Sequence, residues 1–406
     1  MESSVCVGLL WAADLQPSSE RLVRIKTVFL SLILMCASIA IAQVPCGPAI
    51  MPKATLFVDW PQLGFDGAHS ACNPYETILG PANVGNLTLA WTYPTIDGYS
   101  PVVANGAVYV GDATGTLYSL NAANGTPLWT YQVPQDYCLA TPAVANGIAY
   151  FGCTRENNYN GSDGIFALDA GTGALRWSVG EAGFGFSIVN GILYYAESLG
   201  GLIGRVAARN AATGEYLWGY EAGFNVTAPV VANGIVYFGA TDKNVYALNA
   251  TTGALIWQAQ TIDTPYVGPA ADGRVYVTAG GYPEEDLYAF NAATGALIWQ
   301  KSGFSLAGGI AHGVLYATAR GLYALNGSTG DVIWNFPLGG ANLAVANGVV
   351  YTCDCGENLY AVDANTGAQL WNYPADYYGS SPAVANGMLY IGTIKSGMLA
   401  FHLPGH

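Results

Sequence analysis

The stretch ALDAGTGALRW, Ala167–Trp177, recurs along the chain and decides its fold. It follows the pattern Ala-x-Asp-x-x-Thr-Gly-x-x-x-Trp, which residues 361–371 match equally well. The units ending at Trp218, Trp257, Trp299 and Trp334 carry Asn in place of Asp, and the unit ending at Trp129 is weaker, with Ser119 and Asn124. A β-prone segment, a turn with Gly at a left-handed position and a Trp-bearing segment predict a strand–turn–strand unit.

Two independent markers count the same number of units. The first is a Trp at intervals of 35 to 48 residues, at Trp91, Trp129, Trp177, Trp218, Trp257, Trp299, Trp334 and Trp371. The second is a turn dipeptide at residues 105–106, 146–147, 190–191, 233–234, 272–273, 312–313, 347–348 and 386–387. Each marker occurs eight times, so we expect eight repeats.

Each repeat is predicted to fold into four strands. In one repeat, residues 228–232 and 235–239 flank Asn233-Gly234, which favours a type I′ hairpin. Residues 245–248 form the third expected strand, and a fourth runs through Trp257. A lone four-stranded sheet is marginal in water, whereas radial stacking of such sheets buries both faces. The fold class predicted is therefore all-β, an eight-bladed β-propeller of four-stranded antiparallel blades.

The two ends of the repeat array are complementary. The segment 87–93 contains the first Trp but no preceding three strands, and the segment 382–403 has three strands but no Trp strand. We expect the strand around Trp91 to pair with residues 398–401, because an open ring would leave two unpaired sheet edges. The predicted organisation is a prefix and secretory signal at 1–42, a leader packing on the propeller at 43–84 and the propeller at 85–406.

The composition agrees with a β-protein and excludes two classes. Of 406 residues, 52% are apolar and 10% charged, and 52 are Gly. This combination excludes a disordered chain. The net charge of −14 excludes a nucleic-acid partner, because phosphate would be repelled.

A secretory signal is predicted near the N-terminus. Arg24 and Lys26 precede the apolar run 27–41, and Ala40-Ile41-Ala42 is a small-x-small site for cleavage after Ala42. A membrane anchor is the alternative, although the run is short for a span. Cys36 follows Met35 where a lipoprotein signal needs a small residue, so we expect release into the periplasm or medium of a bacterium, with no transmembrane span in the mature chain.

The Trp motif resembles the tryptophan-docking repeat of pyrroloquinoline-quinone (PQQ) propellers, the quinoprotein alcohol dehydrogenase-like family. In that family the Trp stacks between neighbouring blades, which implies a structural docking role for all eight Trp residues named above. The leader also resembles the opening of quinoprotein alcohol and glucose dehydrogenases, in Asp59-Trp60-Pro61, Gly64, Asp66, Asn73-Pro74, Ile78, Asn83-Val84, Leu87 and Ala90-Trp91.

The sequence departs from the enzymes of that family in two ways. Its repeats are minimal, without the insertions that build the cofactor site, and it has no adjacent Cys pair. The calcium-binding and catalytic residues of the enzymes cannot be mapped onto it. In size and repeat it resembles the non-catalytic members, such as the scaffold lipoprotein of the outer-membrane barrel-assembly machinery.

Six cysteines follow the predicted signal, an even number in an oxidising compartment. Cys138 and Cys153 flank the hairpin at residues 146–147, and counting outward from it brings them within reach of a disulfide. Cys46 and Cys72 both lie in the leader and form a second expected pair. For Cys353 and Cys355 a disulfide, a metal site and two thiols all remain open.

The loops that follow each Trp are the candidate ligand site. Several combine an acid with an aromatic residue, and together they predict an acidic, aromatic funnel around the propeller axis. Its members are Asp97, Tyr99, Asp136, Tyr137, Glu221, Phe224, Asp263, Tyr266, Asp376 and Tyr378. Scattered surface acids are the alternative reading.

The function expected is that of an exported, monomeric, non-catalytic binding or scaffold module. It would take a protein or a small polar ligand on one propeller face, and we expect no catalytic residue, metal or cofactor. The main alternative, implied by the resemblance, is a quinoprotein oxidoreductase of the alcohol or sugar dehydrogenase type with PQQ and Ca²⁺. A third is another catalytic or glycan-binding propeller.

Overall fold

The turn dipeptides fold into type I′ hairpins, as the sequence predicts. The first residue of each has φ between 44° and 54°, and the Gly that follows has φ between 73° and 78°. Both values lie in the left-handed region that this turn requires. At one repeat His312 takes this conformation in place of Asn or Asp.

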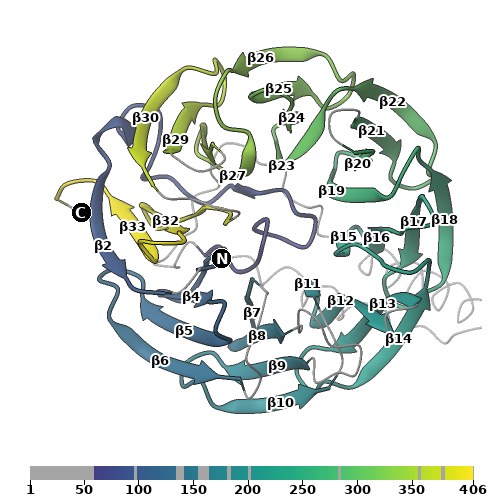
Figure 1. Cartoon of the computed structure of the whole chain (residues 1–406), viewed down its shortest axis with the longest axis horizontal. Helices are drawn as coiled ribbons and strands as arrows, with labels where there is room; N and C mark the ends of the chain where they lie inside the picture. The colour runs from purple at the N-terminus through teal and green to yellow at the C-terminus, as the bar shows by residue number, and fades with distance from the viewer. Residues whose placement is uncertain are drawn as a thin grey trace, which may run out of the picture. The chain divides into compact units, whose positions relative to one another are not determined.

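The computed structural model describes residues 59–95, 98–133, 141–153, 164–180, 184–199, 203–281, 285–354, 358–375 and 380–405. They belong to one unit, Pro45–His406, and a separate unit, Met1–Val44, lies outside them. Within the described residues the sheets form an eight-bladed β-propeller, which confirms the predicted fold class (Figure 1). No helix in this part of the chain has the length and apolar character of a membrane span.

In seven blades the four antiparallel strands follow one another outward from the axis in chain order. The first three blades are β3 (Val102–Ala104), β4 (Ala107–Gly111), β5 (Thr116–Asn121) and β6 (Pro127–Gln132); β7 (Ala143–Ala145), β8 (Ile148–Cys153), β9 (Gly164–Asp169) and β10 (Leu175–Val179); and β11 (Phe184–Val189), β12 (Ile192–Leu199), β13 (Ile203–Asn210) and β14 (Tyr216–Glu221).

The next three are β15 (Val230–Ala232), β16 (Ile235–Gly239), β17 (Asn244–Asn249) and β18 (Leu255–Gln260); β19 (Pro265–Ala271), β20 (Arg274–Ala279), β21 (Asp286–Asn291) and β22 (Leu297–Ser302); and β23 (Ser305–Ala311), β24 (Val314–Thr318), β25 (Leu322–Asn326) and β26 (Val332–Phe336). The seventh blade is β27 (Ala341–Ala346), β28 (Val349–Cys353), β29 (Asn358–Asp363) and β30 (Gln369–Pro374). The leader adds β1 (Cys72–Asn73) parallel to β27, and the 3-10 helix η1 (Val84–Asn86) follows.

The eighth blade joins the two ends of the array. It contains β31 (Ala383–Ala385), β32 (Met388–Gly392) and β33 (Met398–His402), and β2 (Thr88–Tyr93) is its outermost strand. Trp91 pairs with Ala400 in the antiparallel register of β2 and β33. The predicted closure of the ring by an N-terminal strand is therefore confirmed.

The eight Trp side chains connect neighbouring blades. Each indole Nε1–H donates to a backbone carbonyl of the next blade, and Trp371 donates to Leu87 just before β2, at 2.9–3.2 Å. Seven of the rings also lie against the turn Gly of the next blade, so close that a Cβ added there would come 2.6–3.1 Å from the ring. The Gly of the motif thus has two causes, a turn with positive φ and the space for an indole.

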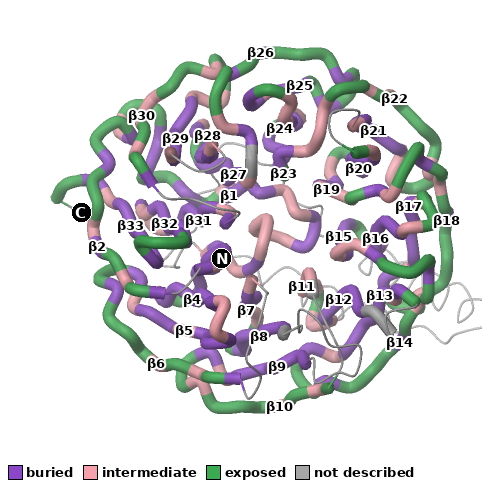
Figure 2. Tube along the Cα trace, in the orientation of Figure 1, coloured by how far each residue is buried: buried purple, intermediate pink, exposed green. Residues whose placement is uncertain are grey.

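Burial falls from the axis to the rim. The inner and middle strands are buried, and the outermost strands carry the exposed positions (Figure 2). β4 is buried at every position, whereas β6 is half-buried to exposed throughout. The inner and middle strands therefore form the core of the propeller, and the outermost strands form its rim.

Candidate functional site

The leader crosses the innermost strand of every blade in turn. In seven blades the backbone N–H two residues before the turn dipeptide donates to the leader at 2.6–3.0 Å; the acceptors are the carbonyls of Trp60, Pro61, Gly67, Ala68, Ser70 and Ala71 and the Oε1 of Gln62. In the eighth, the Nδ2 of Asn73 donates to the Val384 carbonyl at 2.8 Å. Residues 60–73 thus follow the whole ring beside the hairpins of the innermost strands. Figure 1 shows this segment near the axis.

Asp66, His69 and Ser70 of this axial segment and Ser187 of β11 form two hydrogen-bonded pairs. The carboxylate of Asp66 accepts from the backbone N–H and the hydroxyl of Ser70 at 3.0 and 2.9 Å. Burial raises the pKa of Asp66 above its usual range. Burial lowers the pKa of His69 to about 4, so its imidazole is neutral at pH 7.

The hydrogen bonds of His69 argue against nucleophilic catalysis here. Its Nε2 lies 3.2 Å from the hydroxyl of Ser187, which itself donates to the Pro229 carbonyl at 2.7 Å. Because the Ser187 proton is directed at that carbonyl, Nε2 carries a proton and donates to Ser187. An imidazole in this tautomer holds Ser187 in place and does not take its proton.

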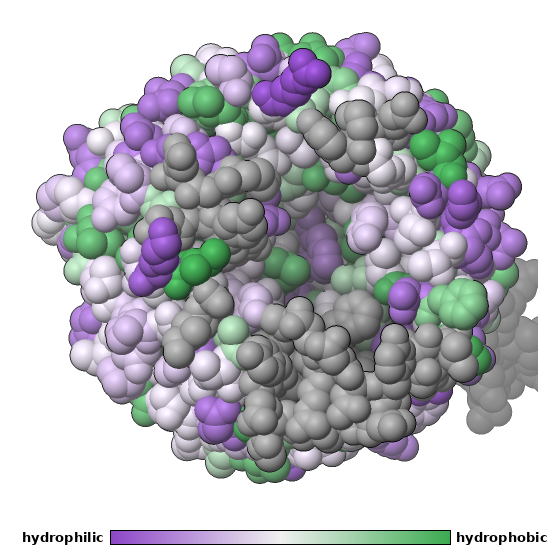
Figure 3. All heavy atoms as spheres, viewed as in Figure 1, coloured by the Kyte–Doolittle hydropathy of each residue, from purple (hydrophilic) through white to green (hydrophobic). Residues whose placement is uncertain are grey.

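The opposite face carries the loops between the second and third strands and those between blades. Figure 3 shows the molecule down the axis, with a hollow near the centre of the surface. Of the predicted funnel, Asp97, Asp136, Tyr137, Asp376 and Tyr378 lie outside the described residues. Tyr99, Glu221, Phe224, Asp263 and Tyr266 are described.

Three apolar side chains are exposed on this face where two inter-blade connections meet one loop. Phe224, Ile262 and Tyr266 are 62%, 52% and 64% exposed. The Phe224 backbone N–H donates to the Thr241 hydroxyl at 2.9 Å, and the Nζ of Lys243 donates to the Ile262 carbonyl at 3.1 Å. Both inter-blade loops therefore contact the loop between β16 and β17, and we call these three side chains with Asp263 the Phe224–Tyr266 patch.

The remaining described funnel residues lie in other blades. Tyr99 is half-buried, and its backbone N–H donates to the Gly111 carbonyl of the first blade at 3.1 Å. Glu221 is exposed at the end of β14, opposite Arg205 in the register with β13. The structure thus brings Phe224, Asp263 and Tyr266 around one loop and leaves Tyr99 apart. Sequence reasoning missed Ile262, which is marked only as an apolar residue in a polar loop.

Only some of the cysteines in the predicted pairs lie among the described residues. Cys72 takes part in a disulfide, but Cys46 lies outside the described residues, so that pairing stays a prediction. Ala145 pairs with Ile148 as expected beside the hairpin, yet Cys138 is also outside the described part, so its bond to Cys153 stays a prediction. Cys353 is buried in β28, and Cys355 is not described.

Two features of the described residues bear on whether they could hold PQQ and its cation. Across them, no group of three or more His, Cys, Asp and Glu side chains could hold a metal ion. The docking indoles are engaged between blades, and Trp60 is buried against Phe65 with ring centroids 5.4 Å apart, so none of these Trp rings is left to stack on a quinone. We therefore derive no chemistry through this cofactor.

The ring of docked blades defines the class, a PQQ-type β-propeller. A family model described as outer membrane protein assembly factor BamB matches residues 88–221, 161–302, 263–343 and 318–403. These matches span most of the chain, and the chain therefore belongs to this family of PQQ-repeat propellers.

Curated relatives fall into two groups. An alcohol dehydrogenase (quinone) dehydrogenase subunit of Gluconobacter oxydans is 28% identical over 51% of this chain and 25% of its own length. The outer membrane protein assembly factor BamB of Yersinia pestis is 27% identical over 39% of this chain and 43% of its own length. The aligned parts therefore span less than half of these relatives.

Solved structures share the fold at low identity. A quinohemoprotein alcohol dehydrogenase from Pseudomonas putida HK5 has a TM-score of 0.68 at 17% identity, covering 90% of this chain and 83% of that one. BamB from Moraxella catarrhalis has a TM-score of 0.62 at 18% identity, covering 79% and 98%. One fold thus serves both an enzyme and an assembly factor, and function must be argued from the site.

Proposed function

We propose that this chain is an exported, non-catalytic propeller that binds a protein partner through the Phe224–Tyr266 patch. The patch is the observation that supports the proposal, since three large apolar side chains, each more than half exposed, are grouped on one face. Exposed aromatic residues in such groups are typical of protein interfaces.

The charge of the patch suggests the chemistry of the partner. Asp263 lies within it, Glu221 precedes Phe224 by three residues, and the chain as a whole carries −14. A complementary surface would place apolar side chains against the aromatic rings and basic groups around them. The docked blades hold the patch in place before binding, which lowers the ordering cost of association.

Export rests on the predicted signal at residues 1–42 and is supported by the Cys72 disulfide, since disulfides persist in oxidising compartments. We place the protein in the periplasm or outside a bacterial cell. The description of its family makes components of outer-membrane protein assembly the first partners to examine.

A double variant tests the proposal. Phe224→Ser with Tyr266→Ser should lower capture of barrel-assembly components by at least about tenfold in cross-linked envelope fractions. Leu128→Ser with Leu297→Ser, two exposed aliphatic residues on the outer rim, is the matched control and should leave capture unchanged. Equal capture by both double variants and the wild type would contradict the role of the patch.

The alternative function is a PQQ- and Ca²⁺-dependent oxidoreductase, supported by the names of several relatives. We expect no stable complex when the protein is incubated with PQQ and Ca²⁺, desalted and examined by absorption spectroscopy. A stoichiometric quinone spectrum together with dye-linked alcohol oxidation would replace the scaffold proposal with the enzyme.

A further inference from the structure

The repeats contain a second hydrogen bond that accompanies each docking Trp. In six blades the hydroxyl of a buried second-strand Tyr donates to the same carbonyl that accepts the indole N–H, at 2.9–3.1 Å; these are Tyr109, Tyr150, Tyr194, Tyr237, Tyr276 and Tyr390. Tyr276 and Trp299, for example, share the Gly327 carbonyl. These six blades therefore define the regular arrangement, in which the tyrosine hydroxyl is hydrogen-bonded to the protein.

Tyr316 departs from this pattern. Trp334 still donates to the Ala364 carbonyl at 3.0 Å, and the two rings are 6.0 Å apart, as they are for Tyr276 and Trp299. The Tyr316 hydroxyl nevertheless forms no hydrogen bond within the described part of the chain, and it lines a pocket. Tyr351 in the next blade also has an unpartnered hydroxyl. Both tyrosines are at most 1% exposed, but only Tyr316 lines the pocket.

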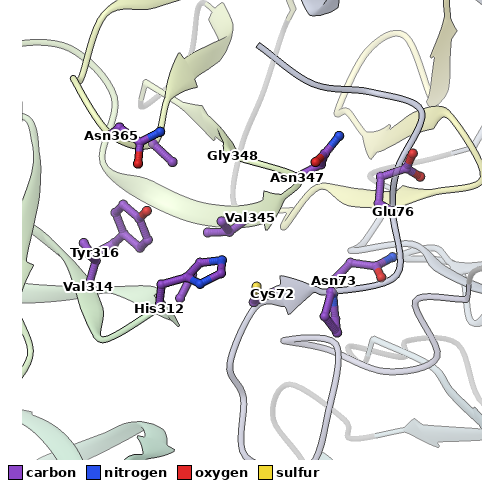
Figure 4. A pocket seen from close by; sticks show the side chains of 13 residues that line it. Cys72, Asn73, Glu76, His312, Val314, Tyr316, Val345, Asn347, Gly348 and Asn365 are labelled. Atoms are coloured by element: carbon purple, nitrogen blue, oxygen red, sulfur yellow. The ribbon is translucent and has the colours of Figure 1, made fainter. Parts of the chain in front are cut away.

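The pocket has a volume of about 410 Å³ and lies on the hairpin side, where the leader passes the sixth and seventh blades. This volume is within the range of small-molecule sites. Figure 4 shows Tyr316 and Asn365 on one side of it and the leader with Cys72, Asn73 and Glu76 on the other. The side chain of Val345 contributes an apolar wall.

Three polar groups in this pocket are available to a ligand. Besides the Tyr316 hydroxyl, the side-chain amide of Asn365 and the ring of His312 form no hydrogen bond to another described residue. Both residues are exposed in turns, and their rings and amides can donate and accept. Planar amides and hydroxyls beside an apolar wall suit a ligand with several hydroxyl groups and C–H faces.

Among its described lining residues, the pocket lacks a Lys or Arg side chain that could bind an anionic ligand. Its carboxylate, Glu76, is buried and accepts three backbone N–H groups, from Ile78, Leu79 and Gly387, at 2.7–3.1 Å. Those three bonds direct most of its acceptor capacity toward the protein backbone. Burial raises the pKa of Tyr316, so the hydroxyl stays a neutral donor in the physiological range.

We propose that the pocket formed by Tyr316, His312 and Asn365 binds an uncharged polyhydroxylated molecule of monosaccharide size. It lies on the hairpin face, away from the Phe224–Tyr266 patch, and so it is independent of the proposed scaffold function. In this blade the Tyr316 hydroxyl would donate to the ligand. In six other blades the corresponding tyrosine hydroxyl donates to a backbone carbonyl of the protein.

The test measures binding of D-glucose, D-galactose and N-acetyl-D-glucosamine to the full mature chain by calorimetry and saturation-transfer NMR. At least one should bind, and Tyr316→Phe should weaken it roughly tenfold, the effect of one lost hydrogen bond. Asn365→Ala should also weaken it. Tyr276→Phe, whose hydroxyl is engaged with Gly327, is the matched control and should bind like the wild type.

Two further measurements distinguish ligand binding by Tyr316 from a structural role, and a neutral ligand from an anionic one. Tyr316→Phe should leave the melting temperature unchanged, because its hydroxyl makes no bond to the protein, whereas Tyr276→Phe should lower it. D-gluconate, the carboxylate analogue of glucose, should bind more weakly than the sugar. The proposal is overturned if none of the three sugars binds, if Tyr316→Phe binds equally well, or if gluconate binds better.

Discussion

One oxygen atom explains why the motif accepts Asp or Asn at the same position. The Oδ1 of Asp169 accepts from the backbone N–H groups of Gly171 and Thr172, and the Oδ1 of Asn249 makes the same bonds in its own turn. Only an acceptor is needed, so charge is not. In the repeat that carries Asp169 the charge also forms an ion pair, since the Arg176 guanidinium donates to its Oδ2 at 2.6 Å and lowers its pKa to about 2.

The turn glycines give a prediction with its own control. Gly295→Ala should destabilise the protein, because φ is +70° and the new Cβ would lie 2.6 Å from the Trp257 ring. Gly234→Ala has a similar φ of +77° but nothing within 4 Å, so it reports backbone strain alone. Urea unfolding should show Gly295→Ala less stable than the control by about 1–3 kcal/mol. Equal stabilities would mean that the indole can move aside.

The buried imidazole of His69 gives a pH dependence. Its pKa of about 4 lies below the unfolded value of 6.5, so between these values the unfolded chain binds a proton that the folded chain does not. Stability from this group is therefore complete above pH 6.5 and falls as the pH drops, by up to about 3 kcal/mol.

The raised pKa values of Asp59 and Asp66 act in the opposite direction near the lower end of this range. For that reason the quantity to measure is the difference in unfolding free energy between the wild type and His69→Gln. In this difference the contributions of the two carboxylates cancel. Urea unfolding at pH 7 and pH 4.5 should show a smaller loss of stability for His69→Gln. An identical loss in both proteins would rule out His69 as its source.

Among the elements, the blades could be predicted from the sequence and the course of the leader could not. Each blade repeats a side-chain signature, in which Asx, Thr-Gly and Trp have separate physical roles. The leader bonds mainly through the backbone carbonyls of residues such as Trp60, Pro61 and Gly67, and carbonyls leave no pattern in a sequence. The same holds for the candidate site, where residue types marked the loops but only the structure placed Phe224 and Tyr266 beside one loop.

Gln62 is the place where a leader side chain replaces a carbonyl. Its buried Oε1 accepts from the Ile188 N–H at 2.9 Å. Gln62→Ala should leave that N–H without a partner, cost about 1–3 kcal/mol and speed hydrogen exchange in peptides covering β11. Gln300→Ala, on the outer strand of another blade, is the control and should leave exchange in β11 unchanged. Unaltered exchange in both variants would show that water replaces the glutamine.

At the scale of the whole molecule, two separate devices involve the N-terminal segment. β2 completes the outer edge of the eighth blade, and the leader covers the inner edges of all eight. The first device prevents two open sheet edges, and the second fixes the ring from within. Their contributions can be separated because β2 and the leader are consecutive in sequence but contact opposite edges of the sheets.

Circular permutation separates the contribution of β2 to stability from that of the leader. Thr88 pairs with His402, so the end of β33 lies beside the start of β2, and a short Gly linker can join residue 405 to residue 85 as an ordinary hairpin. A chain that starts at residue 98 and stops at 405 should aggregate, because its eighth blade lacks β2 and exposes an unpaired edge. The permuted chain, 98–405 followed by the linker and 85–95, restores that strand without the leader. It should be soluble and unfold cooperatively, at a lower melting temperature than the full chain, since the inner strands lose their partners. Light scattering and calorimetry distinguish the three proteins, and a soluble, cooperative 98–405 chain would show that closure by β2 is dispensable.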